Sequence, residues 1–174
     1  DFGRAEFMGK ADFGQATFYG DAYFWYDVLN NERFEPAKFA GEADFSEAMF
    51  KGRVCFSKAE FLDNADFSGA KFIYKANFSQ VNFESEATFW RTEGNSFFSL
   101  QDETDFTDAV YRAPEKIRFM SVSFEKCLIA NKFSDLSKIG FYDVKWPVRN
   151  KKRIVYEEIV TKGKPDYEHL KKTY

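Results

Sequence analysis

The stretch that decides the fold is residues 37–72, AKFAGEADFSEAMFKGRVCFSKAEFLDNADFSGAKF, in which a phenylalanine returns every five or six residues. The series extends in both directions, and its members are Phe2, Phe7, Phe13, Phe18, Phe24, Leu29, Phe34, Phe39, Phe45, Phe50, Phe56, Phe61, Phe67, Phe72, Phe78, Phe83 and Phe89. Steps of five and six residues alternate, with one exception from Leu29 to Phe34. A fixed short period of this kind is typical of a solenoid.

The position two residues before each central residue is also constrained. From Phe7 to Phe89 it is alanine or valine everywhere except at Asp27 and Glu32, which flank Leu29. Neither helical spacing nor simple alternation fits this pattern. We interpret each unit as three extended residues pointing in, out and in, followed by a corner. Strands stacked about 4.8 Å apart would then place the phenylalanines in columns. The predicted core residues are Phe45, Phe56, Phe67, Phe78 and Phe89.

Two types of corner alternate along the chain. In a six-residue step, the residue two places after the phenylalanine is often glycine, asparagine or aspartate, as at Gly9, Gly41 and Asp63. These residues tolerate positive φ, so we predict the strained backbone at the six-residue corners. Five-residue steps instead carry a small residue directly after the phenylalanine, as at Ser46 and Ser68. Four sides of alternating length predict a turn of about 22 residues.

The units ADFSE, ADFSG, AEFLD, AKFIY and ANFSQ resemble the A-(D/N)-(L/F)-x-x units of the pentapeptide-repeat family. The resemblance covers residues 2–89 tightly and residues 96–146 loosely, and this chain departs from the plain pattern by inserting a sixth residue in every second unit. It implies an all-β fold, a right-handed quadrilateral β-helix. Some relatives combine Trp-Pro with a Tyr-x-x-Leu-Lys-x-x-Tyr helix, as at residues 167–174 here, and continue into membrane-spanning segments.

The chain organisation follows from where the pattern weakens. We expect a β-helix over residues 1–146, regular over 2–89 and degenerate over 90–146, followed by a basic turn and a short C-terminal helical cap over 147–174. Residues 25–36, WYDVLNNERFEP, interrupt the repeat. Either a loop replaces one side there or the backbone bulges outward, and we favour a local bulge because the register resumes at Phe39.

Composition narrows the class of protein. The chain has 174 residues, 23 of them phenylalanine, and only two cysteines, Cys55 and Cys127. We expect Cys55 to face outward and Cys127 inward, so that both are free thiols of a reducing compartment. No apolar run reaches the roughly 20 residues of a membrane span. The prediction is a cytoplasmic protein, membrane-associated if a longer chain supplies a tether.

Charge is divided along the chain. Residues 1–110 carry ten lysines and arginines against twenty acidic residues, whereas residues 111–174 carry fifteen against eight. The residues at the six-residue corners also predict two charged edges that run along the coil. One edge would be basic, with Lys10, Arg53 and Lys75. The other would be acidic, with Asp21, Glu42, Asn64 and Glu86, and a solvated surface is the simplest explanation of both.

No motif for catalysis is present. The single histidine, His169, lies in the expected cap, and no phosphate-binding loop, metal-binding motif or nucleophile elbow occurs. We therefore predict no catalytic, cofactor-binding or metal-binding residues, no cofactor and no small-molecule substrate. The chain is expected to be a rigid interaction scaffold, or the soluble part of a membrane-tethered protein. The alternative is a DNA-mimicking inhibitor of a topoisomerase, because gyrase-protecting relatives resemble duplex DNA in shape and charge.

The expected interaction surface consists of outward aromatic and acidic side chains. Aromatic residues predicted to face out are Tyr19, Tyr23, Trp25, Tyr26, Tyr74 and Trp90. The candidate surface is Trp25, Tyr26, Glu42, Asp63, Glu86 and Trp90, since large aromatics often anchor protein partners. We expect a protein partner, disfavour nucleic acid, and expect the Phe2 end to allow further coils or end-to-end association with a second copy.

Overall fold

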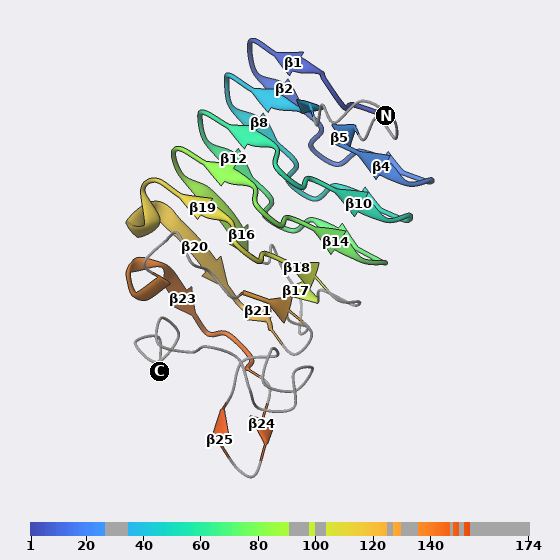
Figure 1. The fold of residues 1–174 in the computed structure, drawn as a ribbon. Helices are drawn as coiled ribbons and strands as arrows, with labels where there is room; N and C mark the ends of the chain where they lie inside the picture. Colours follow the sequence, from blue (N-terminus) through green and yellow to red (C-terminus); the bar gives the residue numbers. More distant parts are fainter. Residues whose placement is uncertain are drawn as a thin grey trace.

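The computed structural model describes residues 1–26, 35–90, 98–99, 104–124, 127–129, 136–146, 148–149 and 152–153. Within these residues the chain winds as a coil of short parallel strands, seen as a stack of similar turns in Figure 1. Each turn visits four faces in the same order, which we name A, B, C and D. The four-sided architecture predicted from the sequence is therefore present.

The strands of the four faces are as follows. Face A contains β1 (Glu6–Phe7), β7 (Lys38–Phe39), β11 (Glu60–Phe61), β15 (Asn82–Phe83) and β19 (Val110–Tyr111). Face B contains β2 (Ala11–Asp12), β8 (Ala43–Asp44), β12 (Ala65–Asp66), β16 (Ala87–Trp90), β20 (Ile117–Met120) and β23 (Gly140–Tyr142). Face C contains β3 (Thr17–Phe18), β9 (Met49–Phe50) and β13 (Lys71–Phe72), continued by β17 (Phe98–Ser99) and β21 (Val122–Ser123). Face D contains β4 (Ala22–Tyr23), β10 (Val54–Cys55), β14 (Ala76–Asn77), β18 (Thr104–Asp105) and β22 (Cys127–Leu128).

Strand register gives the length of a turn. Ala65 of β12 pairs with Ala87 of β16, and Val54 of β10 pairs with Ala76 of β14. In both pairs the residue numbers differ by 22, the length predicted from the sequence. In these strands each alanine or valine therefore lies above the equivalent residue of the next turn.

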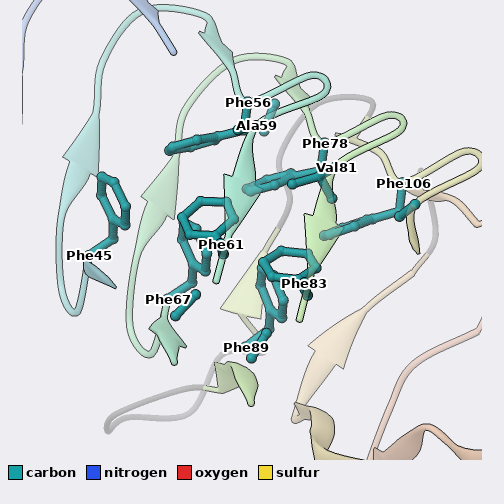
Figure 2. Packing of buried hydrophobic residues seen from close by; sticks show 14 of the residues in the cluster. Phe45, Phe56, Ala59, Phe61, Phe67, Phe78, Val81, Phe83, Phe89 and Phe106 are labelled. Atoms are coloured by element: carbon teal, nitrogen blue, oxygen red, sulfur yellow. The ribbon is translucent and has the colours of Figure 1, made fainter. Parts of the chain in front are cut away.

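The core is a set of phenylalanine columns. In face B, Phe45 and Phe67 stack with ring centroids 5.0 Å apart and an interplanar angle of 1°, and Phe67 and Phe89 with 5.0 Å and 3°. In face D, Phe56 and Phe78 stack with centroids 5.0 Å apart. Figure 2 shows these rings pointing into the tube from different faces, and rings of neighbouring columns meet edge to face, as Phe67 does with Phe78 at 90°. The five named phenylalanines are 0 or 1% exposed.

The degenerate turns keep the same inward positions with larger side chains. Ile117, Val122 and Cys127 occupy places that alanine fills in the earlier turns, and all three are buried. Phe119 stacks on Phe89 with centroids 4.9 Å apart. The columns therefore continue beyond the regular repeats.

The position of the strained backbone corrects the sequence interpretation. The described non-glycine residues with positive φ are Arg4, Gln15, Glu47, Lys58, Gln80, Asp108, Ser121 and Asp143. Each stands two places after an inward aromatic residue at a five-residue step, and Gly69 occupies the same position with φ 67°. A backbone bond closes the turn, as from Ala48 N–H to the Phe45 oxygen at 3.1 Å. This geometry resembles a type II turn, and the prediction of positive φ at the six-residue corners was wrong.

The glycines of the six-residue corners serve close approach instead. A Cβ on Gly41 would lie 2.7 Å from the backbone carbon of Gly9, and one on Gly52 would lie 2.4 Å from that of Gly20. Stacked corners thus bring backbone against backbone, and only glycine leaves room there.

The aspartates and asparagines next to the phenylalanines hold the five-residue corners. Asp44 Oδ1 accepts the Ser46 N–H at 2.9 Å, and Asn77 Oδ1 accepts the Ser79 N–H at 2.9 Å. This local bond from a residue to the backbone two places on is the Asx turn. It explains why (D/N)-F-S recurs in the sequence.

Residues 25–36 are inserted between two faces and replace neither. The Ala37 N–H donates to the Phe24 oxygen at 2.9 Å, so face A follows face D directly. Strands β5 (Trp25–Tyr26) and β6 (Glu35–Pro36) pair antiparallel at the base of this excursion. Consequently Phe7 pairs with Phe39, 32 residues later. Leu29 and Phe34, counted in the sequence as inward positions, and the favoured outward bulge lie outside the described residues.

Smaller elements lie between the strands of the last turns and after them. The 3-10 helices η1 (Pro114–Lys116) and η2 (Leu136–Lys138) contact each other, and β24 (Val148–Arg149) pairs antiparallel with β25 (Lys152–Arg153). No α-helix occurs in the described residues. The helical cap expected near the C-terminus lies outside them, in residues 154–174.

Candidate interaction surface

Residues 25–36 add ten residues between the first two turns. The charged corners therefore stack on partners that differ from those expected from the sequence. Gly20–Asp21 stacks on Gly52–Arg53, because the Arg53 N–H donates to Asp21 Oδ1 at 2.7 Å. Lys10 stacks near Glu42, with Nζ 3.8 Å from Oε2. The predicted basic edge of Lys10, Arg53 and Lys75 and the predicted acidic edge containing Asp21 and Glu42 are therefore wrong. Each six-residue corner carries both signs of charge.

The corner between faces A and B holds three of the predicted surface residues. Glu42 and Asp63 are exposed, whereas Glu86 is half-buried and forms an ion pair with Arg118. Asn64 joins neighbouring turns here, since its Oδ1 accepts the Ser85 hydroxyl at 2.9 Å. Charges of this corner largely pair with one another across turns.

The corner between faces C and D contains a shallow depression of about 480 Å³. Its lining residues are Tyr19, Gly20, Asp21, Lys51, Gly52, Arg53 and Tyr74. They come from three successive turns, at the steps that follow β3, β9 and β13. We call this the C/D depression. Tyr19 is 78% exposed and Tyr74 is 54% exposed, so both rings are accessible.

Charge and aromatic rings meet in the C/D depression. Lys51 Nζ lies over the Tyr19 ring, 4.4 Å from its centroid, a cation–π arrangement. The Tyr23 hydroxyl donates to Asp21 Oδ2 at 3.0 Å. The hydrogen bond from the Arg53 N–H, followed by that from Tyr23, holds the pKa of Asp21 below its usual value. The Asp21 carboxylate is thus engaged on both oxygens, and the side chains of Lys51 and Arg53 face solvent.

A second surface lies where face B turns into face C. Strand register places Trp90 beside Met120 and Met120 beside Tyr142. Trp90 is 44% exposed and Tyr142 is 53% exposed. In the earlier turns the same position holds Gly14, Ser46 and Ser68. The corner therefore changes from small to large apolar side chains along the solenoid.

The remaining predicted surface residues lie at the excursion. Trp25 of β5 is half-buried, and the backbone of Tyr26 pairs with Glu35. The structure places Trp25 and Tyr26 on one short strand, and Glu42, Asp63 and Glu86 on the A/B corner. Trp90 belongs to the apolar group described above. The six residues are therefore distributed over three regions of the surface.

Sequence reasoning missed Lys51, Met120 and Tyr142 as surface candidates. The signal for Met120 and Tyr142 is positional, since each directly follows an inward phenylalanine at a five-residue step, where small residues are usual. Lys51 follows Phe50 at a six-residue step and carries no such signal. Lys51 could be grouped with Tyr19 only once the inserted residues 25–36 were recognised. The correct register was needed before neighbouring turns could be compared.

Two further observations concern the chemistry available. Within the described residues, no group of three or more histidine, cysteine, aspartate or glutamate side chains is arranged to hold a metal ion. Cys55 is half-buried and Cys127 buried, neither forms a disulfide, and burial raises the pKa of Cys55. In the same part of the chain, no helix has the length and apolar character needed to cross a membrane.

Comparison with models of protein families gives a match. Residues 45–93 match the family model described as Pentapeptide repeats (9 copies). No curated protein and no solved structure matched the chain. The matched residues begin at Phe45 and cover two turns of the coil whose geometry is described above, while the same four-faced winding begins earlier, at β1.

Proposed function

Because residues 45–93 of this chain are pentapeptide repeats, we propose that the protein is a non-catalytic, rigid scaffold for protein–protein interaction. The observation that carries this proposal is the continuous phenylalanine core. Phe13, Phe45, Phe67, Phe89 and Phe119 form one unbroken column, each stacked on the next at 4.9 or 5.0 Å. Inward positions are thus used for packing, and the outward positions are available for recognition.

Rigidity is what such a scaffold contributes to binding. Side chains at equivalent places in successive turns are held about 4.8 Å apart by the strand spacing. A partner that matches this spacing does not have to order the surface when it binds, which reduces the entropic cost of association. Exposed tyrosine, tryptophan and arginine are the residues enriched in the energetic centres of protein interfaces. The chain presents them at the C/D depression and beside Trp90.

The experiment compares the wild-type chain with a variant in which only outward-facing side chains are changed and the core is kept. The wild-type chain and a variant with Tyr19, Tyr74, Trp90 and Tyr142 changed to serine are immobilised and incubated with native membrane and cytosolic fractions. We expect proteins retained by the wild type to be lost from the variant. Equal retention by both chains, or by neither, would contradict the proposal. Retention confined to the membrane fraction would favour the membrane-tethered form of the scaffold.

The alternative function is DNA mimicry, and one observation favours it. Glu42, Asp63 and Glu86 lie on one corner, with Asp44 and Asp66 on the adjoining face. Against it, Lys10 approaches Glu42 and Asp44, and Arg118 pairs with Glu86. A titration of the chain into a topoisomerase–DNA mixture decides between the two. We expect no competition with DNA, and displacement of DNA would support mimicry instead.

A further inference from the structure

We propose that the C/D depression binds a short, extended peptide segment of a partner protein in which an acidic residue stands next to aromatic or apolar residues. This inference rests on the proposed scaffold function and assigns it a site and a ligand chemistry. Its lining combines two exposed tyrosines with two solvent-facing cations, Lys51 and Arg53. These rings and cations surround a hollow of about 480 Å³.

The shape of the depression favours an extended chain. Gly20 and Gly52 line the depression without side chains. An approaching backbone therefore meets backbone at this corner. Tyr19 and Tyr74 stand two turns apart, which corresponds to about 10 Å at the usual strand spacing. About three residues of an extended peptide cover that distance.

Local charge sets the preference for an acidic residue. Residues 1–110 carry twice as many acidic as basic side chains, yet Lys51 and Arg53 stand together here. The one carboxylate in the lining, Asp21, already accepts hydrogen bonds from the Arg53 N–H and from Tyr23. The side chains of Lys51 and Arg53 are therefore positioned to pair with carboxylates of a ligand. Tyr19 and Tyr74 supply flat apolar surface on either side for its neighbours.

The same charge count disfavours a nucleic acid. Binding to nucleic acid draws its strength from many phosphate contacts, about 6–10 in well-studied cases, and weakens steeply with salt. Two lining cations beside one carboxylate give only a small fraction of that number. A peptide needs only one or two charge pairs, because packing on the rings adds to its affinity.

The test begins with selection from a phage-displayed library of random dodecapeptides on the immobilised wild-type chain. Enriched peptides are then measured by fluorescence anisotropy against three chains. These are the wild type, the double variant Lys51→Gln/Arg53→Gln, and the matched control Lys116→Gln/Lys138→Gln, which removes the same charge from exposed positions on η1 and η2. All four lysines and arginines are exposed, so the folded core is retained in both variants.

We expect enriched peptides to carry aspartate or glutamate beside an aromatic residue. Their affinity should fall at least tenfold in Lys51→Gln/Arg53→Gln and less than twofold in the control. Peptides that bind the double variant as tightly as the wild type would overturn this site, although the scaffold function would survive because a peptide still binds. Binding of a dodecathymidine oligonucleotide that depends on Lys51 and Arg53 would overturn the peptide class.

Discussion

At the residue scale, glycine has two different roles in this solenoid, and a pair of substitutions separates them. Gly20 and Gly52 occupy the same corner in successive turns. A Cβ on Gly52 would lie 2.4 Å from the Gly20 backbone, whereas one on Gly20 would meet nothing within 4 Å. We expect Gly52→Ala to destabilise the fold by about 1–3 kcal/mol, as overpacking does, and Gly20→Ala to change it by less than about 0.5 kcal/mol. Urea unfolding followed by circular dichroism measures both, and equal effects would contradict this account of the corner.

A second prediction at this scale concerns the pH dependence of Asp44. Partial burial opposes ionisation of Asp44, but hydrogen bonds from the Ser46 hydroxyl and N–H, together with the Lys10 charge, lower its pKa. A lowered pKa in the folded state contributes stability above the unfolded pKa of about 4, and this contribution is lost as the pH falls through the folded value. Asp44→Asn keeps the Oδ1 acceptor, as Asn77 does in its own turn.

The wild type should therefore exceed Asp44→Asn in stability by about 0.5–1 kcal/mol at pH 7. The difference should shrink as the pH falls from 7 to 3, because the contribution decreases below the unfolded pKa of about 4. Urea unfolding at the two pH values gives the free energies. A difference that stays constant between pH 3 and pH 7 would show that the charge of Asp44 does not contribute.

At the element scale, the excursion over residues 25–36 should be removable. Deleting residues 25–34 leaves Phe24 five positions before Phe39, the spacing of Phe56 and Phe61 at the equivalent corner. The residue left at the positive-φ position would be Pro36, whose ring fixes φ near −65°. The deletion is therefore combined with Glu35→Ser and Pro36→Gly, which supply the residues that this corner needs.

We expect the shortened chain to fold with a melting temperature equal to or above that of the wild type, since the columns keep their register and the closing loop is shorter. Thermal unfolding by circular dichroism measures this. The matched control deletes residues 40–49, which contain the face B strand β8 and the first residue of the face C strand β9, and it should abolish folding. Loss of folding in both chains would mean that residues 25–34 supply a side of the coil.

The excursion also shows how far sequence carries the fold. The spacing of Phe45, Phe67 and Phe89 predicted the 22-residue turn and the columns, because few structures return one residue type to the same face at that interval. The spacing through Leu29 and Phe34 predicted two further sides, whereas face A follows face D directly from Phe24 to Ala37. The contrary signal was Asp27 and Glu32, which occupy places where alanine is needed for packing. Spacing alone could not separate an inserted segment from two irregular sides.

The candidate surface was less predictable, because sequence spacing alone does not show which turns lie next to each other. Exposed tyrosines could be recognised individually, but their neighbours depend on which turns stack together. Placing Arg53 beside Asp21 requires knowing that ten extra residues intervene between them. The positive φ at Glu47 and Lys58 was also missed, because these side chains do not indicate left-handed backbone in isolation. Local sequence identifies the core, while the surface is set by long-range register.

At the scale of the whole molecule, a solenoid whose turns contact only their neighbours should respond to core damage according to position. Phe67 lies in the middle of its column, stacked on Phe45 and Phe89 and in edge contact with Phe56, Phe61 and Phe78. Phe7 lies near one end and is only partly buried, with one stacked partner, Phe39. Each substitution to alanine removes a ring, but only Phe67→Ala interrupts the column on both sides.

Phe67→Ala should therefore cost about 3–5 kcal/mol, the usual cost of truncating a buried phenylalanine. It should also divide the unfolding transition, because turns on either side of the defect no longer support each other. Phe7→Ala should cost less and keep a single transition, since the end turn frays without affecting the rest. Urea titration with simultaneous circular dichroism and tryptophan fluorescence in a Trp25→Phe background tests this, because the remaining Trp90 and Trp146 report on turns beyond the defect while the circular dichroism reports on all of them. Coincident transitions with equal losses in both variants would mean that the coil unfolds as one indivisible unit, and stability would then not be a sum of contributions from neighbouring turns.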